Sequence, residues 1–252
     1  MIISKSNNFA VMRAPKTGGT SLQAYMFESG LVDHDADTYI LDGDFSTWAE
    51  FKAFSEANDN LEYTSLPESM YGTETLSEAH KTYSKAVEQG LLEEGTPCIG
   101  TIRHPLEWMA AQYTYANIRR KLDAQKNLRL NFSYSAQDIA LARQLAEPNA
   151  SFDNCLAVKF SNRHIFEALK PQTLYYPKDA ELFNTENIHE HASAFIAARG
   201  GIAPTRKIEL RKSINIDLNY YIDNLTPGRK QVILDDYEDD FIAWEKAYAK
   251  FN

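Results

Sequence analysis

The segment of residues 9–25, FAVMRAPKTGGTSLQAY, constrains the fold of this chain more than any other. It begins with four apolar residues, FAVM, a length and composition typical of a buried strand. A polar turn with two glycines follows, and Leu22, Tyr25 and Met26 then recur at helical spacing. The segment therefore predicts a strand, a glycine-containing loop and a helix in direct succession.

The loop of residues 13–21 has the composition of a phosphate-binding turn. Its glycines let backbone N–H groups close around an anion, and the start of the next helix adds a partial positive charge. Lys16 supplies a full charge, and nearby Thr and Ser hydroxyls can donate hydrogen bonds. In nucleotide triphosphatases the lysine follows the glycines, whereas Lys16 precedes both, so that motif is absent. An ordinary turn between strand and helix, with a capping Thr or Ser, remains an alternative.

Length and charge narrow the class of protein. With 252 residues, 44% of them hydrophobic, the chain can form one α/β domain with a sizeable core. A net charge of −9 argues against a general nucleic-acid binder, so an anionic ligand would need a local basic site. Cys98 and Cys155 form no CxxC pair, and no disulfide framework or metal site is indicated. Neither a signal peptide nor a membrane-spanning run is present, and we expect a cytoplasmic protein.

A second strand is predicted at residues 97–102, PCIGTI, and it runs directly into Arg103, His104 and Pro105. An arginine at the carboxyl end of a parallel strand faces the crevice in which such sheets bind ligands. The remaining predicted elements are helices at 76–90, from Leu106 to about 122, at 186–199 and from Thr226-Pro227 onward, and a strand at 173–176.

Two of these segments resemble the motifs of sulfotransferases that use 3′-phosphoadenosine 5′-phosphosulfate (PAPS). PKTGGTS in the first loop resembles the family's 5′-phosphosulfate loop. IRHPLEWMAAQY resembles its 3′-phosphate motif in Arg103, Pro105 and Tyr113. Trp108 and Ala111 depart from that motif, because they stand where a second arginine and a serine are usual.

Within this family the chain most resembles the carbohydrate sulfotransferases of the uronyl and heparan 2-O type. That group has an R-x-P-K-T loop and a histidine about two dozen residues before the Arg-x-Pro segment, which here is His80. It also has a late LRK-T segment, here LRKS at 210–213, and a Tyr-x-x-Asp-Phe helix, here residues 237–241. The resemblance spans the chain and is sharpest in the first loop.

This resemblance implies a P-loop-like central parallel sheet flanked by helices, with additional C-terminal helices, in a single sulfotransferase-like domain of residues 1–252. It implies transfer of a sulfuryl group from PAPS to an acceptor hydroxyl on a carbohydrate, with the 3′,5′-bisphosphate PAP as product and no metal. Lys16 would stabilise developing charge and His80 would be the general base. The residues expected to bind PAPS are Arg13, Lys16, Thr17, Gly18, Gly19, Thr20, Ser21, Arg103, Arg211 and Ser213.

Two alternatives stay open. A non-catalytic PAP- or PAPS-binding protein is suggested by Trp108 and Ala111. A P-loop nucleotide kinase would share the fold and the phosphate loop, although the position of Lys16 speaks against it.

Overall fold

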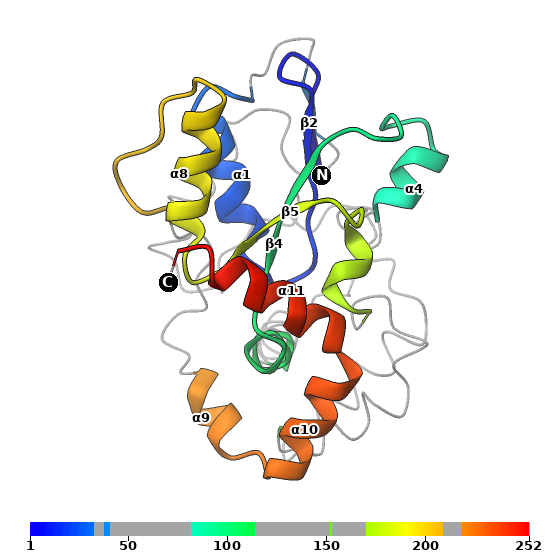
Figure 1. The fold of residues 1–252 in the computed structure, drawn as a ribbon, viewed down its shortest axis with the longest axis vertical. Helices are drawn as coiled ribbons and strands as arrows, with labels where there is room; N and C mark the ends of the chain where they lie inside the picture. The colour runs from blue at the N-terminus through cyan, green and yellow to red at the C-terminus, as the bar shows by residue number, and fades with distance from the viewer. Residues whose placement is uncertain (33–37, 41–81, 114–151, 153–169, 209–217, 252) are drawn as a thin grey trace, which may run out of the picture.

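The computed structural model describes residues 1–32, 38–40, 82–113, 152, 170–208 and 218–251 (Figure 1). Within these ranges five strands form one sheet in the order β3-β1-β2-β4-β5. The strands are β1 Ile2–Ser4, β2 Phe9–Val11, β3 Thr38–Ile40, β4 Cys98–Ile102 and β5 Glu181–Asn184. The predicted α/β class is thereby confirmed.

The sheet is mixed, whereas the sequence predicted a parallel one. Strands β2, β4 and β5 are parallel, with Ala10 opposite Cys98 and Ile102 opposite Asn184. In contrast, β1 is antiparallel to both β2 and β3. The reason is that β1 and β2 are joined by a short turn, which can only connect antiparallel neighbours. Asn8 closes this turn at a φ of 48°, a conformation that asparagine tolerates better than most residues.

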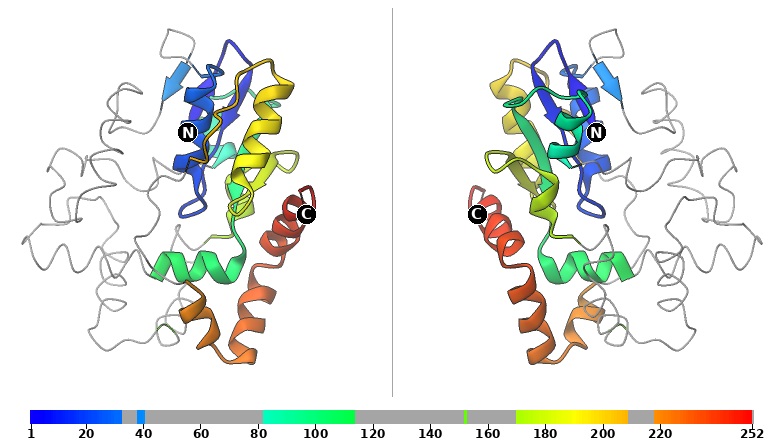
Figure 2. Two further views of the ribbon diagram at one scale, coloured as in Figure 1. Left: turned by 90° about the vertical axis from the view of Figure 1, so that its left-hand side faces the viewer. Right: turned by 90° about the vertical axis from the view of Figure 1, so that its right-hand side faces the viewer.

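Helices cover both faces of the sheet. Helix α1, Gly19–Glu28, and helix α8, Ile188–Ala198, pack together on one face (Figure 1). The other face carries α4, Tyr83–Glu88, and the 3-10 helix η4, Gln172–Tyr175. The helical residues 105–113 lie below the sheet, beside α9 Leu218–Asp223 and α10 Pro227–Asp236 (Figure 2). In the described ranges, the helices are too short or too polar to cross a bilayer.

Strand β2 shows how the sequence builds this two-sided core. Successive side chains of a strand point to opposite faces. Phe9 and Val11 accordingly join the cluster under α1 and α8, while Ala10 and Met12 join the cluster under α4 and η4. All four side chains are fully buried, which explains why the segment is a continuous apolar run rather than an alternating one.

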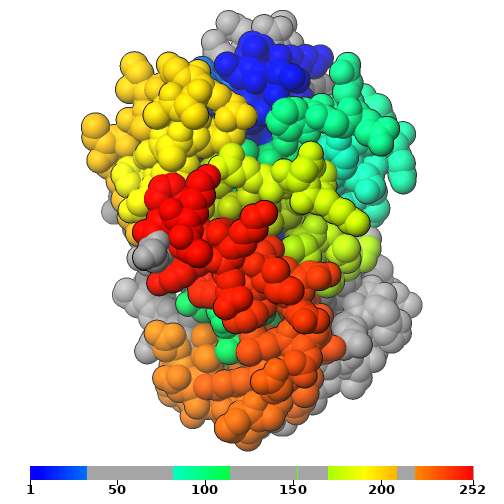
Figure 3. Space-filling view, viewed as in Figure 1, coloured from blue at the N-terminus to red at the C-terminus, as the bar shows by residue number. Residues whose placement is uncertain are grey.

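The C-terminal end of the chain returns to the sheet. Helix α10 begins at Pro227 with Thr226 as its cap, as predicted. It ends at Asp236, and a separate helix α11, Glu238–Tyr248, packs against β4, β5 and η4. Seen from outside, α11 forms a surface ridge over this part of the molecule (Figure 3).

One predicted strand is wrong, and a real strand was missed. Residues 173–176 belong to or follow η4, because Pro171 begins a tight turn in which Leu174 N–H donates to the Pro171 carbonyl. The strand is instead β5, four residues with polar Glu181 and Asn184 at its ends. The predicted helix at 186–199 is confirmed as α8. His80, Arg211 and Ser213 lie outside the described residues.

Candidate phosphate-binding site

The carboxyl ends of β2, β4 and β5 bring three loops to one edge of the sheet. Thr185, directly after β5, joins the other two loops. Its hydroxyl lies 2.9 Å from the Thr17 carbonyl and 3.1 Å from the Ile102 carbonyl. The Thr185 N–H also donates to the Ile102 carbonyl, at 3.0 Å. Open α/β sheets bind ligands at this edge, so the location suits the predicted site.

The loop after β2 has a left-handed backbone at two positions. Gly18 has a φ of 87° and is the N-cap of α1, and Lys16 has a φ of 64°. A Cβ on Gly18 would lie 3.3 Å from the methyl group of Thr185, and one on Gly19 would lie 2.8 Å from Cγ of Arg13. The two glycines are therefore required by conformation at the first position and by space at the second.

Lys16 adopts a backbone conformation that is unfavourable for a residue with a side chain. Such a conformation costs on the order of 1 kcal/mol, and residues held this way cluster at functional sites. Lys16 precedes the glycines at the turn of the loop, and its side chain is only partly buried. The structure thus places the predicted charge on a strained, accessible turn.

Thr17 anchors the loop from below. Its side chain is fully buried, and its hydroxyl donates to the Ala14 carbonyl at 3.0 Å. Because that proton is used, Thr101 must be the donor in the 2.8 Å contact between the two threonine hydroxyls. Tyr176 adds a second link, since its hydroxyl accepts from Ala14 N–H and donates to the Thr101 carbonyl. Burial raises the pKa of Tyr176 to about 12, which keeps this donor protonated.

Arg13 and the start of α1 are brought together as predicted. The guanidinium donates to Thr20 Oγ1 and to Gln23 Oε1, both at 3.3 Å. Its aliphatic part lies across Gly19. Ser21 is on the same first turn, and like Thr20 it is largely buried. Arg13 therefore supports the loop and the helix start on which an anion would rest.

Arg103 follows β4 and faces a different environment. Its Nε is buried and has no hydrogen-bond partner among the described residues. Burial lowers the pKa of the guanidinium, while the nearby carboxylates of Glu107 and Glu186 act in the opposite direction. A buried, unsatisfied guanidinium nitrogen is uncommon and needs an explanation, and a bound anion would supply one.

Sequence reasoning missed the acidic pair beside Arg103. Burial, then the charge of Glu186, raises the pKa of Glu107, and the two carboxyl groups also share a hydrogen bond. Trp244 of α11 donates its indole N–H to Glu186 at 3.2 Å. Glu186 could have been found if β5 had been recognised, because a residue at its carboxyl end must lie near the end of β4.

His104 belongs to the same region. Burial lowers its pKa, which favours the neutral ring. Leu106 N–H donates to its Nδ1 at 3.2 Å, so the proton of the neutral ring is on Nε2. The ring packs edge-on against Trp244 and Phe241, with centroids 4.8 Å and 5.5 Å away. His104 is thus a packed residue of the wall formed by α11.

The two departures from the 3′-phosphate motif are both buried. Trp108 is completely inaccessible, and its indole N–H donates to the Pro15 carbonyl at 2.7 Å. Its ring also packs edge-on against Tyr237. Ala111 lies one turn further on in the same helical segment and is 3% exposed. At the position where the motif usually has an arginine, this chain therefore braces the first loop.

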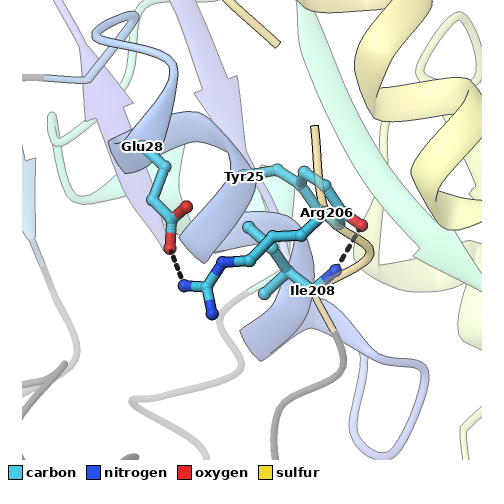
Figure 4. A network of polar contacts seen from close by, with 4 residues as sticks. All are labelled: Tyr25, Glu28, Arg206 and Ile208. Carbon is cyan, nitrogen blue, oxygen red and sulfur yellow. Dashed lines mark hydrogen bonds and ion pairs between the residues drawn. The ribbon is translucent and has the colours of Figure 1, made fainter. Parts of the chain in front are cut away.

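The chain before Arg211 and Ser213 is fastened to α1. Ile208, the last residue described before that gap, donates its N–H to the buried Tyr25 hydroxyl at 2.6 Å (Figure 4). Arg206 forms a surface ion pair with Glu28 at 3.1 Å in the same view.

Comparisons of this chain with protein-family models, curated proteins and solved structures found no match. The functional interpretation accordingly depends on the residues and geometry of the site.

Proposed function

We propose that this chain is a PAPS-dependent sulfotransferase with a P-loop-like fold and that its acceptor is a carbohydrate hydroxyl. One observation carries the proposal: the loop PKTGGTS and Arg103 occupy one edge of the sheet, at the carboxyl ends of neighbouring parallel strands. The loop is a strained glycine-containing turn that leads into a helix N-terminus. Arg103 has a buried guanidinium nitrogen, Nε, without a hydrogen-bond partner among the described residues.

The residues present fit the two anionic ends of PAPS. Backbone N–H groups at the start of α1, with Lys16, would bind the 5′-phosphosulfate end, where the helix dipole favours negative charge. Arg103 would bind the 3′-phosphate with charge-assisted hydrogen bonds, each contributing about 1.5–3 kcal/mol. Arg211 and Ser213 remain proposed contributors to that second contact.

When bound, PAPS would supply a sulfuryl group whose sulfur bonds to the acceptor oxygen while its bond to the bridging phosphate oxygen breaks, and PAP leaves with that electron pair. The acceptor proton would pass to His80 as the general base. Lys16 would stabilise the negative charge that develops on the leaving oxygen. These roles assign Lys16 to the transition state and Arg103 to binding.

The direct test incubates the protein with sulfur-35-labelled PAPS and a panel of glycans, and then locates the label. Label on a glycan, at a rate that depends on protein, supports the proposal. Calorimetry with PAP and ADP tests binding independently, and we expect PAP to bind at least about tenfold more tightly because only PAP has a 3′-phosphate. Equal affinities would contradict the assignment of Arg103.

A second candidate function is a non-catalytic PAP- or PAPS-binding protein. The favouring observation is that Trp108, in the position of a usual arginine, is committed to the Pro15 carbonyl. His80→Asn separates the two functions. In an enzyme it should leave PAP affinity intact and lower turnover by roughly 10²–10⁴. A binder shows no turnover in either form, and an enzyme whose turnover survives the change uses another base.

A further inference from the structure

The backbone of Arg103 is paired by a side chain rather than by a strand. Gln172 accepts a hydrogen bond from Arg103 N–H through Oε1, at 2.9 Å, and donates from Nε2 to the Arg103 carbonyl, at 3.0 Å. Its side chain therefore satisfies both backbone groups of the first residue beyond β4. Gln172 is fully buried, so water does not compete for these bonds.

Gln172 is itself fixed by Asp240 from a third part of the chain. One carboxylate oxygen of Asp240 accepts Gln172 N–H at 2.7 Å, and the other accepts the N–H and hydroxyl of Thr173 at 2.9 and 2.8 Å. Asp240 thus binds the start of η4 from the first turn of α11, and it is fully buried. Burial raises its pKa, while these hydrogen bonds act against that shift.

These contacts form a continuous path from α11 through η4 to Arg103. Charge-assisted bonds to a carboxylate are about twice as strong as neutral ones, so Asp240 holds the start of η4 strongly in place. Fixing both backbone groups of Arg103 fixes the direction in which its side chain leaves the main chain. Binding sites depend on such support, because a displacement of about 1 Å in a binding group can remove most of its contribution.

We propose that Gln172 and Asp240 are positioning residues that hold Arg103 in the orientation required to bind an anionic group, taken here to be the 3′-phosphate of the proposed donor. The inference rests on the proposed function of Arg103, and it adds two residues that would touch no ligand. It also gives the Tyr-x-x-Asp-Phe segment a role, because Asp240 is the acidic residue of that segment.

The test measures PAP and ADP affinities by calorimetry for the wild type, Gln172→Met and Arg103→Met. Methionine matches glutamine in length but can form neither bond to Arg103. We expect its PAP-to-ADP preference to fall at least about threefold, toward the value of Arg103→Met, because only the 3′-phosphate contact is lost. A preference within threefold of the wild type would overturn the inference, and the proposed function would stand.

Controls separate positioning from loss of stability. Thr226→Ala removes the cap of α10, where Thr226 accepts from Arg229 N–H, and should lower stability while keeping the preference. If Gln172→Met does not fold, Asp240→Asn replaces it, since it keeps the shape but removes one of the two acceptor oxygens, so that an amide N–H faces the N–H of Gln172 or of Thr173. Asp240→Asn is read by the same threefold criterion. A wild-type protein that binds PAP and ADP equally would overturn both this inference and the assignment of Arg103. A Gln172→Met variant that keeps the wild-type preference would overturn the inference alone.

Discussion

The loops after β2 and β4 lie next to each other, but local contacts contribute much more to the first than to the second. In the first, Arg13 contacts Thr20 and Gln23, and Thr17 bonds back to Ala14, all within ten residues. In the second, the Arg103 backbone is held by Gln172, which is 69 residues away in sequence. The first loop therefore has a local framework that bonds from Trp108, Tyr176 and Thr185 reinforce, whereas the Arg103 backbone is paired by a distant side chain.

The side chains of the two arginines also differ in whether they are hydrogen-bonded within their own loop. Nε of both arginines lacks a hydrogen-bond partner among the described residues. The terminal nitrogens of Arg13 nevertheless donate to Gln23 and Thr20, whereas the Arg103 guanidinium has the carboxylates of Glu107 and Glu186 near it. We infer that the first arginine supports the loop and that the second is available for a ligand. Four predictions test this division.

The largest effect is expected at Lys16. Lys16→Ala and Lys16→Gly both remove the ammonium group, and each should lower turnover by about 10²–10³, with PAP affinity changed less than about threefold. PAP lacks the sulfuryl group, so a charge used in the transition state contributes little to its binding. Steady-state kinetics and calorimetry measure the two quantities.

The glycine variant also serves as a control for backbone strain. Because the φ of Lys16 is 64°, glycine should raise the melting temperature relative to alanine. Turnover should be equally low in both variants. Recovery of turnover in Lys16→Gly alone would mean that backbone strain, and not the ammonium group, accounts for the loss.

The next effect compares the two arginines directly. Arg103→Met should reduce PAP affinity at least about tenfold and leave ADP affinity nearly unchanged, because a charge-assisted bond to the 3′-phosphate is lost. Arg13→Met should weaken PAP and ADP equally and lower stability, since its contacts support a loop that both ligands use. Calorimetry and thermal unfolding distinguish these outcomes, and identical patterns for the two variants would remove the proposed division.

A smaller effect is expected where the two loops meet. Trp108→Phe keeps an aromatic ring but removes the 2.7 Å bond to the Pro15 carbonyl. Leaving that buried acceptor without a donor should lower the free energy of unfolding by about 1–3 kcal/mol. Urea unfolding measures the change, and the PAP-to-ADP preference should persist. A lost preference would show that Trp108 acts on the ligand site itself.

The smallest effect concerns charge beside Arg103. Because burial raises the pKa of Glu107, this carboxyl gains its proton earlier than an ordinary glutamate as the pH falls. Its protonation removes a negative charge near Arg103, so PAP affinity should increase toward lower pH. Glu107→Gln is neutral throughout, and it should bind PAP about threefold more tightly at pH 8 and depend less on pH.

Calorimetry at successively lower pH, starting from pH 8, compares the two proteins, since titration of the phosphate itself is common to both. The groups that face this carboxyl are Arg103 and Glu186, with His104 next to them. A wild type whose pH dependence matched that of Glu107→Gln would exclude Glu107 as the source.

The contrast between the loops also explains how far sequence reasoning reached. The first loop was predicted as strand, turn and helix because glycines and an apolar run encode it locally. The residues that hold the Arg103 backbone were not predicted, because nothing near Gln172 or Asp240 in sequence indicates that Gln172 bonds to Arg103 or that Asp240 bonds to Gln172. The strand β5 was missed because it is short and has polar residues at both ends. Its pairing with β4, the bond from Lys250 to Glu181 and the packing of α11 against it come from distant parts of the chain.

The contact between Trp108 and Pro15 has a practical consequence. The Trp108 indole is wholly shielded from solvent and bonded to the backbone of the first loop. Because it lies on the helix that follows the second loop, its fluorescence can report on both. Occupation of either loop would alter its surroundings and hence the intensity and wavelength of its emission. Binding of PAP should therefore change the intrinsic fluorescence, and Trp108→Phe separates the emission of Trp108 from that of the other two tryptophans.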